Sequence, residues 1–489
     1  AFDESPVEKG VLWAGTNDGL VHVSRDNGKT WKDVTNNIPG LPPLGTVRNI
    51  DASKWDAGKA YITVDFHQVG NFEPYIYKTE NYGRRWKKIT RGIPSSTLSY
   101  ARNVREDPVK PGLLYLGTEN SLYVSLNDGD NWQPLMNNMP ASPMYWIVVQ
   151  EEFNDLVVGT YGRGIWIMDD ITPLQQLTNK VTSSAAHLFE PRKTYRFRSI
   201  TSPFTMFDDP SAGENPPNGA SINYWLKQAA DDSVTIRISD SSGNLIKTMK
   251  GPSVAGINRV WWNLQGEPST KIVLRTKPLY ADWVQLDEDG TRDAVVGRIS
   301  TLTPPGTYTV ELEAAGKKSS QRLTVVKDPH SEGSITDIVE QTEMVQDIQA
   351  DMNSVASLIN RIEIIRSQIY NLRTITKDHD AADEIASAIE SLDEKLIDVE
   401  DKFYQMKLTG TGQDRVRWPS MLAGRLSYLA GNVAVADFHP NDQQREVHQI
   451  LKDRLTLYEK QFNNILRNEL SAFDSLMKKH NLTGIITED

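Results

Sequence analysis

Residues 24–31 read Ser24-Arg-Asp-Asn-Gly28-Lys-Thr-Trp31, and the same pattern returns twice along the chain. The other copies are Thr79-Glu-Asn-Tyr-Gly83-Arg-Arg-Trp86 and Ser125-Leu-Asn-Asp-Gly129-Asp-Asn-Trp132. Each copy has Ser or Thr first, Asp or Asn two positions later, then Gly and finally Trp. Repeats at such a spacing indicate stacked copies of one supersecondary unit. These three copies therefore decide the fold of the N-terminal third.

The pattern is that of the Asp-box, a hairpin turn. We expect its Asp or Asn to accept hydrogen bonds from N–H groups of the turn, its Gly to adopt a positive φ, and its Trp to fold back over the turn. Proteins that carry Asp-boxes place them at a propeller rim, away from ligands. We therefore interpret as scaffold the residues Ser24, Asp26, Gly28, Trp31, Thr79, Asn81, Gly83, Trp86, Ser125, Asn127, Gly129 and Trp132.

The similarity between copies extends beyond the boxes and gives four strands per unit. Residues 3–16 match residues 105–118, and a fourth copy at 156–167 has two of the strands but no box. Four antiparallel strands in each repeat are typical of a β-propeller blade. We thus predict a partial propeller of about 3.5 blades over residues 1–175. An open arc leaves edges and apolar faces bare, so we expect another polypeptide, a cleaved N-terminal half or a separate subunit, to supply the missing blades.

Five segments carry a resemblance to a known family: residues 13–21, 61–67, 104–108, 159–166 and 169–174. They resemble the last blades of bacterial BNR/Asp-box proteins related to the sortilin (VPS10) propeller, often labelled glycosyl hydrolase. The resemblance implies an exported protein, periplasmic, cell-surface or extracellular, whose first half is absent from this sequence. Because such blades serve sialidases, xyloglucanases and peptide-binding receptors alike, the fold does not decide the function.

Two further regions follow a linker predicted at residues 176–190. Between 191 and 328, short β runs alternate with Gly- and Pro-containing turns, which suits a seven-strand Ig-like sandwich. From Ser334, apolar residues recur every three or four positions, which predicts long amphipathic helices. We interpret residues 329–489 as an antiparallel helical bundle, and we also expect assembly with a partner through this region.

Composition narrows the functional classes. The 489 residues include 53 Lys and Arg against 64 Asp and Glu, a net charge of −11, which argues against nucleic acid as a partner. The absence of cysteine excludes disulfides, thiolate catalysis and cysteine-based metal sites. No apolar run is long enough to cross a bilayer. We expect no transmembrane segment, no cofactor and no metal.

Candidate catalytic residues lie at the ends of predicted strands. Asp65 and His67 occupy positions i and i+2, so their side chains point to the same side if the strand continues. Such a pair serves as a general base with its orienting partner, as a metal ligand, or as a structural hydrogen bond in a loop. Glu106 and Asp107 are the other candidate carboxylates. They follow residues 100–105, which are predicted to be the inner strand of a blade, the first of its four strands.

Candidate ligand-binding residues are Arg102, Arg105, Tyr161, Arg163 and Trp166. An arginine in this region can bind a carboxylate with two hydrogen bonds, as sialic acid or a peptide terminus would require. One hypothesis is therefore a binding propeller for peptides, proteins or glycans. The other is a sialidase-like or xyloglucanase-like glycoside hydrolase, although the three arginines and Tyr/Glu nucleophile pair of sialidases are not recognisable as a motif.

Overall fold

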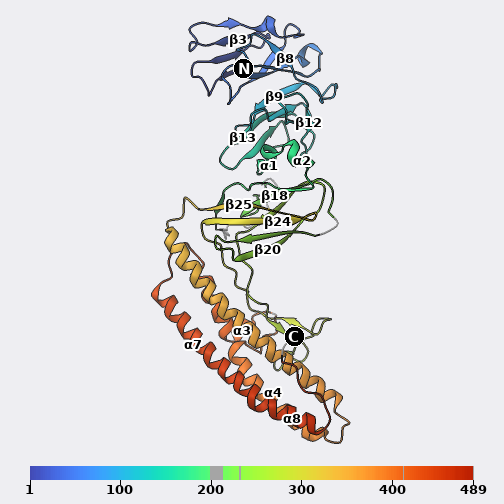
Figure 1. Ribbon diagram of the computed structural model, residues 1–489, viewed down its shortest axis with the longest axis vertical. Helices are drawn as coiled ribbons and strands as arrows, with labels where there is room; N and C mark the ends of the chain where they lie inside the picture. Colours follow the sequence, from blue (N-terminus) through green and yellow to red (C-terminus); the bar gives the residue numbers. More distant parts are fainter. Residues whose placement is uncertain (199–212, 231–232, 411, 488–489) are drawn as a thin grey trace.

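The computed structural model describes residues 1–198, 213–230, 233–410 and 412–487. The molecule is elongated: a series of small sheets lies at one end, two larger sheets lie in the middle, and long helices form the other end (Figure 1). The order along the molecule follows the order along the chain, except that residues 272–299 of the middle region lie beside the helices (Figure 1).

Four antiparallel sheets fill the N-terminal third, and in each the strands follow one another in chain order. The first three sheets have four strands and the fourth has three. The first sheet comprises β1 (Phe2–Glu4), β2 (Leu12–Gly15), β3 (Val21–Ser24) and β4 (Lys32–Asp33). The second comprises β5 (Thr46–Ala52), β6 (Ala60–Asp65), β7 (Tyr75–Thr79) and β8 (Trp86–Lys88). The third comprises β9 (Ala101–Glu106), β10 (Leu114–Thr118), β11 (Leu122–Ser125) and β12 (Gln133–Pro134), and the fourth β13 (Met144–Gln150), β14 (Asp155–Thr160) and β15 (Ile165–Met168).

Consecutive sheets pack face to face through apolar side chains. Strand residues alternate between the two faces, so Ile62 of β6 packs toward the first sheet and its neighbour Tyr61 toward the third. Separate apolar clusters fill the three spaces between neighbouring sheets. Meander sheets stacked in this way are arranged as adjacent propeller blades are.

The three boxes form the same turn. Asp26 accepts hydrogen bonds from the Thr30 N–H at 2.8 Å and the Thr30 hydroxyl at 2.6 Å, and Asn81 and Asn127 accept the equivalent backbone bonds. Gly28, Gly83 and Gly129 all have positive φ, as predicted. A Cβ on Gly129 would lie 2.5 Å from Ile89 Cδ1, so this glycine also lets the turn pack against the preceding sheet.

The tryptophans of the second and third boxes contact the preceding sheet. The sequence predicted only that each Trp would fold back over its own turn. Trp86 lies edge-on to Trp13 of the first sheet, and the Trp132 Nε1–H donates to the Ile89 carbonyl at 2.8 Å. Trp86 and Trp132 are 7% and 2% exposed, whereas Trp31 of the first sheet is 41% exposed. The reason is geometric: among the described residues, no sheet precedes the first one to cover Trp31.

The outward face of the fourth sheet is also uncovered. The strand register places Trp146, Val148, Ile165 and Ile167 on one face, beside Val157. These four are 45–73% exposed, although the opposite face of the same sheet, with Ile147 and Val158, is buried against the third sheet. The fourth sheet thus leaves an apolar face open at one end of the series, and the first sheet leaves Trp31 exposed at the other.

The predicted linker at 176–190 is ordered and carries local structure. It contains α2 (Asn179–Ser183), capped by the Thr178 side chain, and β16 (Ala186–Leu188), and it follows α1 (Thr172–Gln176). Polar contacts join the fourth sheet to the next region: the Arg259 guanidinium donates to the Asp169 and Asp170 carbonyls at 2.7 and 2.6 Å. Because these contacts hold the fourth sheet against the middle region, the segment between the two is not a free linker.

The middle region consists of two sheets around one apolar core. Among the described residues, eight strands form these sheets where seven were expected. The additional strand is β17, which pairs in parallel with β25, an association between distant segments that local patterning does not reveal. The three-stranded sheet contains β16, β18 (Ala220–Leu226) and β21 (Gly256–Trp262); the five-stranded sheet contains β17 (Thr194–Arg196), β25 (Lys317–Lys327), β24 (Gly306–Ala314), β19 (Val234–Ser239) and β20 (Leu245–Gly251).

The C-terminal region is helical and begins where predicted. Ser334 caps α3 (Ile335–Ile375) in a capping box with Asp337. The long connection that contains β22 (Val273–Leu274) and β23 (Arg292–Asp293) contributes Ile272, Leu274 and Ile299 to the core of the helices. The remaining helices are α4 (Ala382–Phe403), α5 (Asp414–Arg417), α6 (Leu422–Val433), α7 (Asp442–Ile465) and α8 (Ser471–Lys479).

The last helical segment runs without a break from Asp442 to Lys479. A π-helical stretch (Leu466–Leu470) joins α7 to α8. In the part of the chain that the structure describes, no helix combines the length and apolar character that crossing a membrane requires.

Candidate functional site

One end of the stacked sheets brings together several of the predicted residues. Asp65, at the end of β6, is 2% exposed by its side chain, and one of its oxygens lies 2.7 Å from His67 Nδ1. The Arg48 Nε of the neighbouring strand β5 lies 3.2 Å from the same oxygen. The Asp65 carboxylate is therefore held between a histidine and an arginine.

Aromatic rings continue this surface toward the fourth sheet. The His67 ring stacks on Tyr100 with centroids 4.9 Å apart, and the Arg102 guanidinium lies 5.0 Å from the Tyr100 ring and 5.1 Å from the Tyr145 ring. Arg102 binds the Glu119 carboxylate, with its Nε at 2.8 Å. Burial, reinforced by Glu119, raises the pKa of Tyr100 to about 12, so its hydroxyl keeps its proton at neutral pH.

Tyr161 and Arg163 lie in the loop that ends this row. The Tyr145 and Tyr161 rings are 5.9 Å apart, and both are exposed. Arg163 is exposed too, and its side chain has no ion pair among the residues that the structure describes. Trp166 supports the loop by donating its Nε1–H to the Arg163 carbonyl at 2.9 Å. We name the whole set the Tyr–Arg surface: Arg48, Asp65, His67, Tyr100, Arg102, Glu119, Tyr145, Tyr161 and Arg163.

Arg105 belongs to a different set of side chains. This set joins the inner strands, which are the first strands of the four sheets: β1, β5, β9 and β13. The Arg105 Nε donates to the Ile147 carbonyl of β13 at 3.1 Å, and its Nη1 lies 3.2 Å from Asp51. Asp3 and Asp51 occupy the equivalent positions of β1 and β5, since they pair with Trp13 and Tyr61 as Arg105 pairs with Tyr115. Asp3 accepts from the Ala52 N–H and Asp51 from the Glu106 N–H, both at 2.7 Å. One side chain per inner strand thus binds the backbone of the next.

The Asp51 carboxyl group should make stability depend on pH. Burial raises its pKa from 3.8 to about 7, against the opposing effect of Arg105. The folded chain therefore retains a proton that the unfolded chain has released, and the free energy of unfolding should fall as pH rises from about 4 to about 7. Asp51→Asn should remove this part of the slope, so that the variant gains in melting temperature relative to the parent between pH 4 and pH 8. A constant difference across that range in calorimetry would contradict this assignment.

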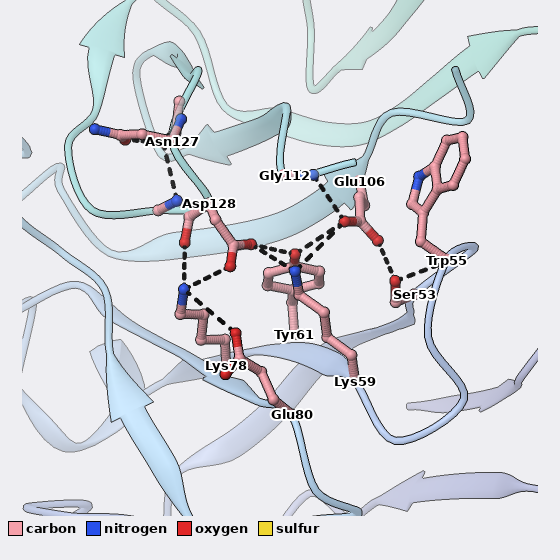
Figure 2. A network of polar contacts seen from close by, with 12 residues as sticks. Ser53, Trp55, Lys59, Tyr61, Lys78, Glu80, Glu106, Gly112, Asn127 and Asp128 are labelled. Carbon is pink, nitrogen blue, oxygen red and sulfur yellow. Dashed lines mark hydrogen bonds and ion pairs between the residues drawn. The ribbon is translucent and has the colours of Figure 1, made fainter. Parts of the chain in front are cut away.

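Glu106, a candidate catalytic residue, lies in the interior between the second and third sheets. Figure 2 shows its carboxylate between Ser53, Tyr61 and Gly112. Its oxygens accept from the Ser53 hydroxyl at 2.5 Å and the Gly112 N–H at 3.0 Å, and one of them lies 3.1 Å from the Tyr61 hydroxyl. Such a carboxylate is held by protein donors and does not face an open surface, so the structure supports a structural role.

Asp128 extends the same network to the third box (Figure 2). It accepts from Lys78 at 2.6 Å, from Lys59 at 2.9 Å and from the Tyr61 hydroxyl at 2.5 Å. The network therefore joins two strands of the second sheet to the box turn of the third sheet. Sequence analysis missed it because Lys59, Lys78 and Asp128 are separated by up to 69 positions and share no motif.

Asp107, the other candidate carboxylate, is also interior. It accepts from the Val109 N–H at 2.7 Å, the Tyr115 hydroxyl at 3.0 Å and the Gln175 side chain at 3.2 Å. It fixes the turn after β9 to α1. Among the described residues, no group of three or more His, Asp or Glu side chains is placed to hold a metal ion.

No family model and no curated protein matches the chain. Solved structures resemble it at low identity. "YCF48 bound to D1 peptide" matches at 12% identity and a TM-score of 0.23, over 66% of this chain and 84% of that one. The GH74 xyloglucanase from Xanthomonas campestris matches at 13% and 0.28, over 66% of this chain and 43% of the enzyme, and an ancestral GH74 enzyme at 14% and 0.29, over 66% and 40%. These neighbours are β-propeller proteins, and likeness at this level assigns neither a ligand nor an activity to the chain.

Proposed function

We propose that the chain is a binding scaffold: an arc of a β-propeller that recognises peptide, protein or glycan ligands carrying a carboxylate. The observation that carries the proposal is the charge arrangement of the Tyr–Arg surface. Its two carboxylates, Asp65 and Glu119, are each held by an arginine, while Arg163 and two tyrosines are left exposed. This surface can therefore offer a cation and aromatic faces to a ligand.

The same arrangement argues against a hydrolase at this place. A glycosidase needs one carboxylic acid to protonate the leaving group and a second carboxylate to act as base or nucleophile. Asp65 is occupied by Arg48 and His67, and Glu119 by Arg102, so neither is presented as an unpartnered acid. A glycoside hydrolase remains the alternative if sheets from another polypeptide bring a second carboxylate opposite Asp65.

We also propose that further sheets complete the ring. The outward face of the fourth sheet and the exposed Trp31 of the first correspond to positions that are buried in the inner sheets. Continuity with those interfaces favours apolar β-sheets as their partners, supplied by an N-terminal half or a separate subunit. Consistent with the resemblance to BNR/Asp-box and sortilin-like proteins, we propose that the assembled protein is exported.

Finer features of the other regions are proposals of the same kind. The two sheets around one core support an Ig-like spacer, and α3, α4, α6 and α7 packed around one core support an antiparallel helical bundle. In this proposal, the middle region and the helical region separate the propeller arc from any partner that binds the helices.

Removal of the Arg163 charge should test the proposed ligand class. On an array of peptides with free carboxyl termini, Arg163→Gln should weaken binding about tenfold, because a charge-assisted hydrogen bond is lost. Amidated copies of the same peptides should bind weakly to both proteins. Arg84→Gln, at an exposed arginine of the second box, is the matched control and should bind as the parent does.

Two outcomes would contradict the proposal. One is equal binding of free and amidated peptides by the parent and by Arg163→Gln. The other is hydrolysis of xyloglucan or of a sialylated glycan that is abolished by Asp65→Asn, which would establish the enzyme instead.

A further inference from the structure

The helical region contains a groove with a volume of about 900 Å³. Its walls come from α6, from the N-terminal half of α7, from the stretch between α4 and α6, and from residues 295–297 of the connection that follows β23. This volume lies within the range of small-molecule sites, which bury most of a ligand against apolar walls. The groove lies in the helical region, at the other end of the molecule from the sheets that carry the Tyr–Arg surface (Figure 1), so this proposal does not rest on the proposed function.

The groove is apolar because the apolar face of α7 is wider than the part that the core of the helices covers. Leu451 and Leu455 face the core of the helices, as an amphipathic helix requires. Val447 and Ile450 instead line the groove and are exposed at its rim, as is Tyr428 of α6. Exposed apolar side chains gathered in one concave place commonly mark a binding site.

The charged side chains of the groove have one sign. Among the described residues no Asp or Glu lines it, although acidic residues outnumber basic ones in the chain by 64 to 53. Its charged lining residues are Arg425 and Arg454. Arg425 donates through Nε to the Ser420 carbonyl at 2.9 Å, and Arg454 has no side-chain partner in the part of the chain that the structure describes. An apolar groove that presents cations is complementary to an apolar molecule with an anionic head.

We propose that this groove binds a long-chain monocarboxylate. The apolar chain would lie against Val447, Ile450 and the leucines of the floor, and the carboxylate would bind the guanidinium groups of Arg425 and Arg454. Guanidinium groups bind carboxylates through two parallel hydrogen bonds, and these are stronger where water is displaced. Binding involves no covalent step and requires no other group.

Titration with decanoate, below its micelle concentration, tests the site in the whole chain. Decanoate should bind more tightly than the uncharged 1-decanol, and decyltrimethylammonium should bind most weakly. Arg454→Gln should weaken decanoate binding about tenfold and leave 1-decanol binding unchanged, because only the head group loses a partner. Ile450→Asn should weaken both.

Lys452→Gln is the matched control, since Lys452 lies on the same helix but lines a separate groove with Glu340 and Asp347. It should bind all three probes as the parent does, and circular dichroism melting should show that each variant is folded. The proposal is overturned if decanoate does not bind, if it binds no more tightly than 1-decanol, or if Arg454→Gln behaves as Lys452→Gln does.

Discussion

Replacement of Glu106 by alanine is expected to lower the free energy of unfolding of the sheet region by about 3–5 kcal/mol. The side chain receives hydrogen bonds from Ser53 and the Gly112 N–H and lies 3.1 Å from the Tyr61 hydroxyl, and all three groups lie in or beside the interior between two sheets. Without the carboxylate, Ser53 and the Gly112 N–H lose their acceptor, Tyr61 keeps only Asp128, and the nearby Lys59 ammonium loses an opposite charge 3.8 Å away. Urea unfolding followed by tryptophan fluorescence measures the loss.

The matched control for this prediction is an ion pair that joins the same two sheets at their surface. Lys87 of β8 and Asp130 of the third box form an ion pair at 2.6 Å, and both side chains are exposed. Exposed pairs contribute less than about 1 kcal/mol, so Asp130→Ala should have a small effect. Equal stability of the Glu106→Ala and Asp130→Ala variants would contradict the structural role given to Glu106.

Placement of a carboxylate on the outward face of the fourth sheet is expected to prevent assembly with the sheets that complete the ring. Ile167→Asp would bury a charge without a partner in an apolar interface, which costs several kcal/mol and weakens association about a hundredfold or more. Native mass spectrometry of the tagged chain, purified from cells that produce the complete protein, measures whether the second polypeptide is retained.

Leu245→Asp provides the comparison, because Leu245 is equally exposed but lies on β20 of the middle region. This variant should keep the partner that Ile167→Asp loses. If both variants retain it, or if the parent chain never carries one, the outward face of the fourth sheet is not an interface.

The repeat in the sequence was sufficient to predict the sheets because its signal is local. Gly28, Gly83 and Gly129 mark the turns, and strand alternation fixes which residues face each neighbouring sheet. The side chains that bind one inner strand to the next were not predicted. Asp3, Asp51 and Arg105 occupy equivalent positions, but two carry a negative charge and one a positive charge, and the backbone groups that they bind lie 42–55 positions away.

The candidate site was predicted only where its residues are close together in the sequence. Asp65 and His67 are two residues apart, and the structure brings them into contact, but not along a continuing strand as expected: β6 ends at Asp65, and the chain turns so that both the N–H and the ring of His67 reach the Asp65 carboxylate. The partners that decide their chemistry, Arg48 and Tyr100, come from other strands. Glu106 and Asp107 appeared as candidates because burial cannot be read from the residue type, and their interior positions became evident only from the packing of the sheets.

Hydroxyl-radical footprinting of tryptophans in the assembled protein tests most directly whether these sheets are an arc of a larger ring. Trp31 and Trp146 are exposed in the isolated chain, at 41% and 51%, whereas Trp13 and Trp132 are buried and Trp283 is exposed on another region. In the assembled protein, oxidation of Trp31 and Trp146 should fall to the level of Trp13 and Trp132, while Trp283 stays reactive. If Trp31 and Trp146 are oxidised as readily as Trp283 in every preparation, no further sheets cover the two end faces, and the account of an incomplete ring is contradicted.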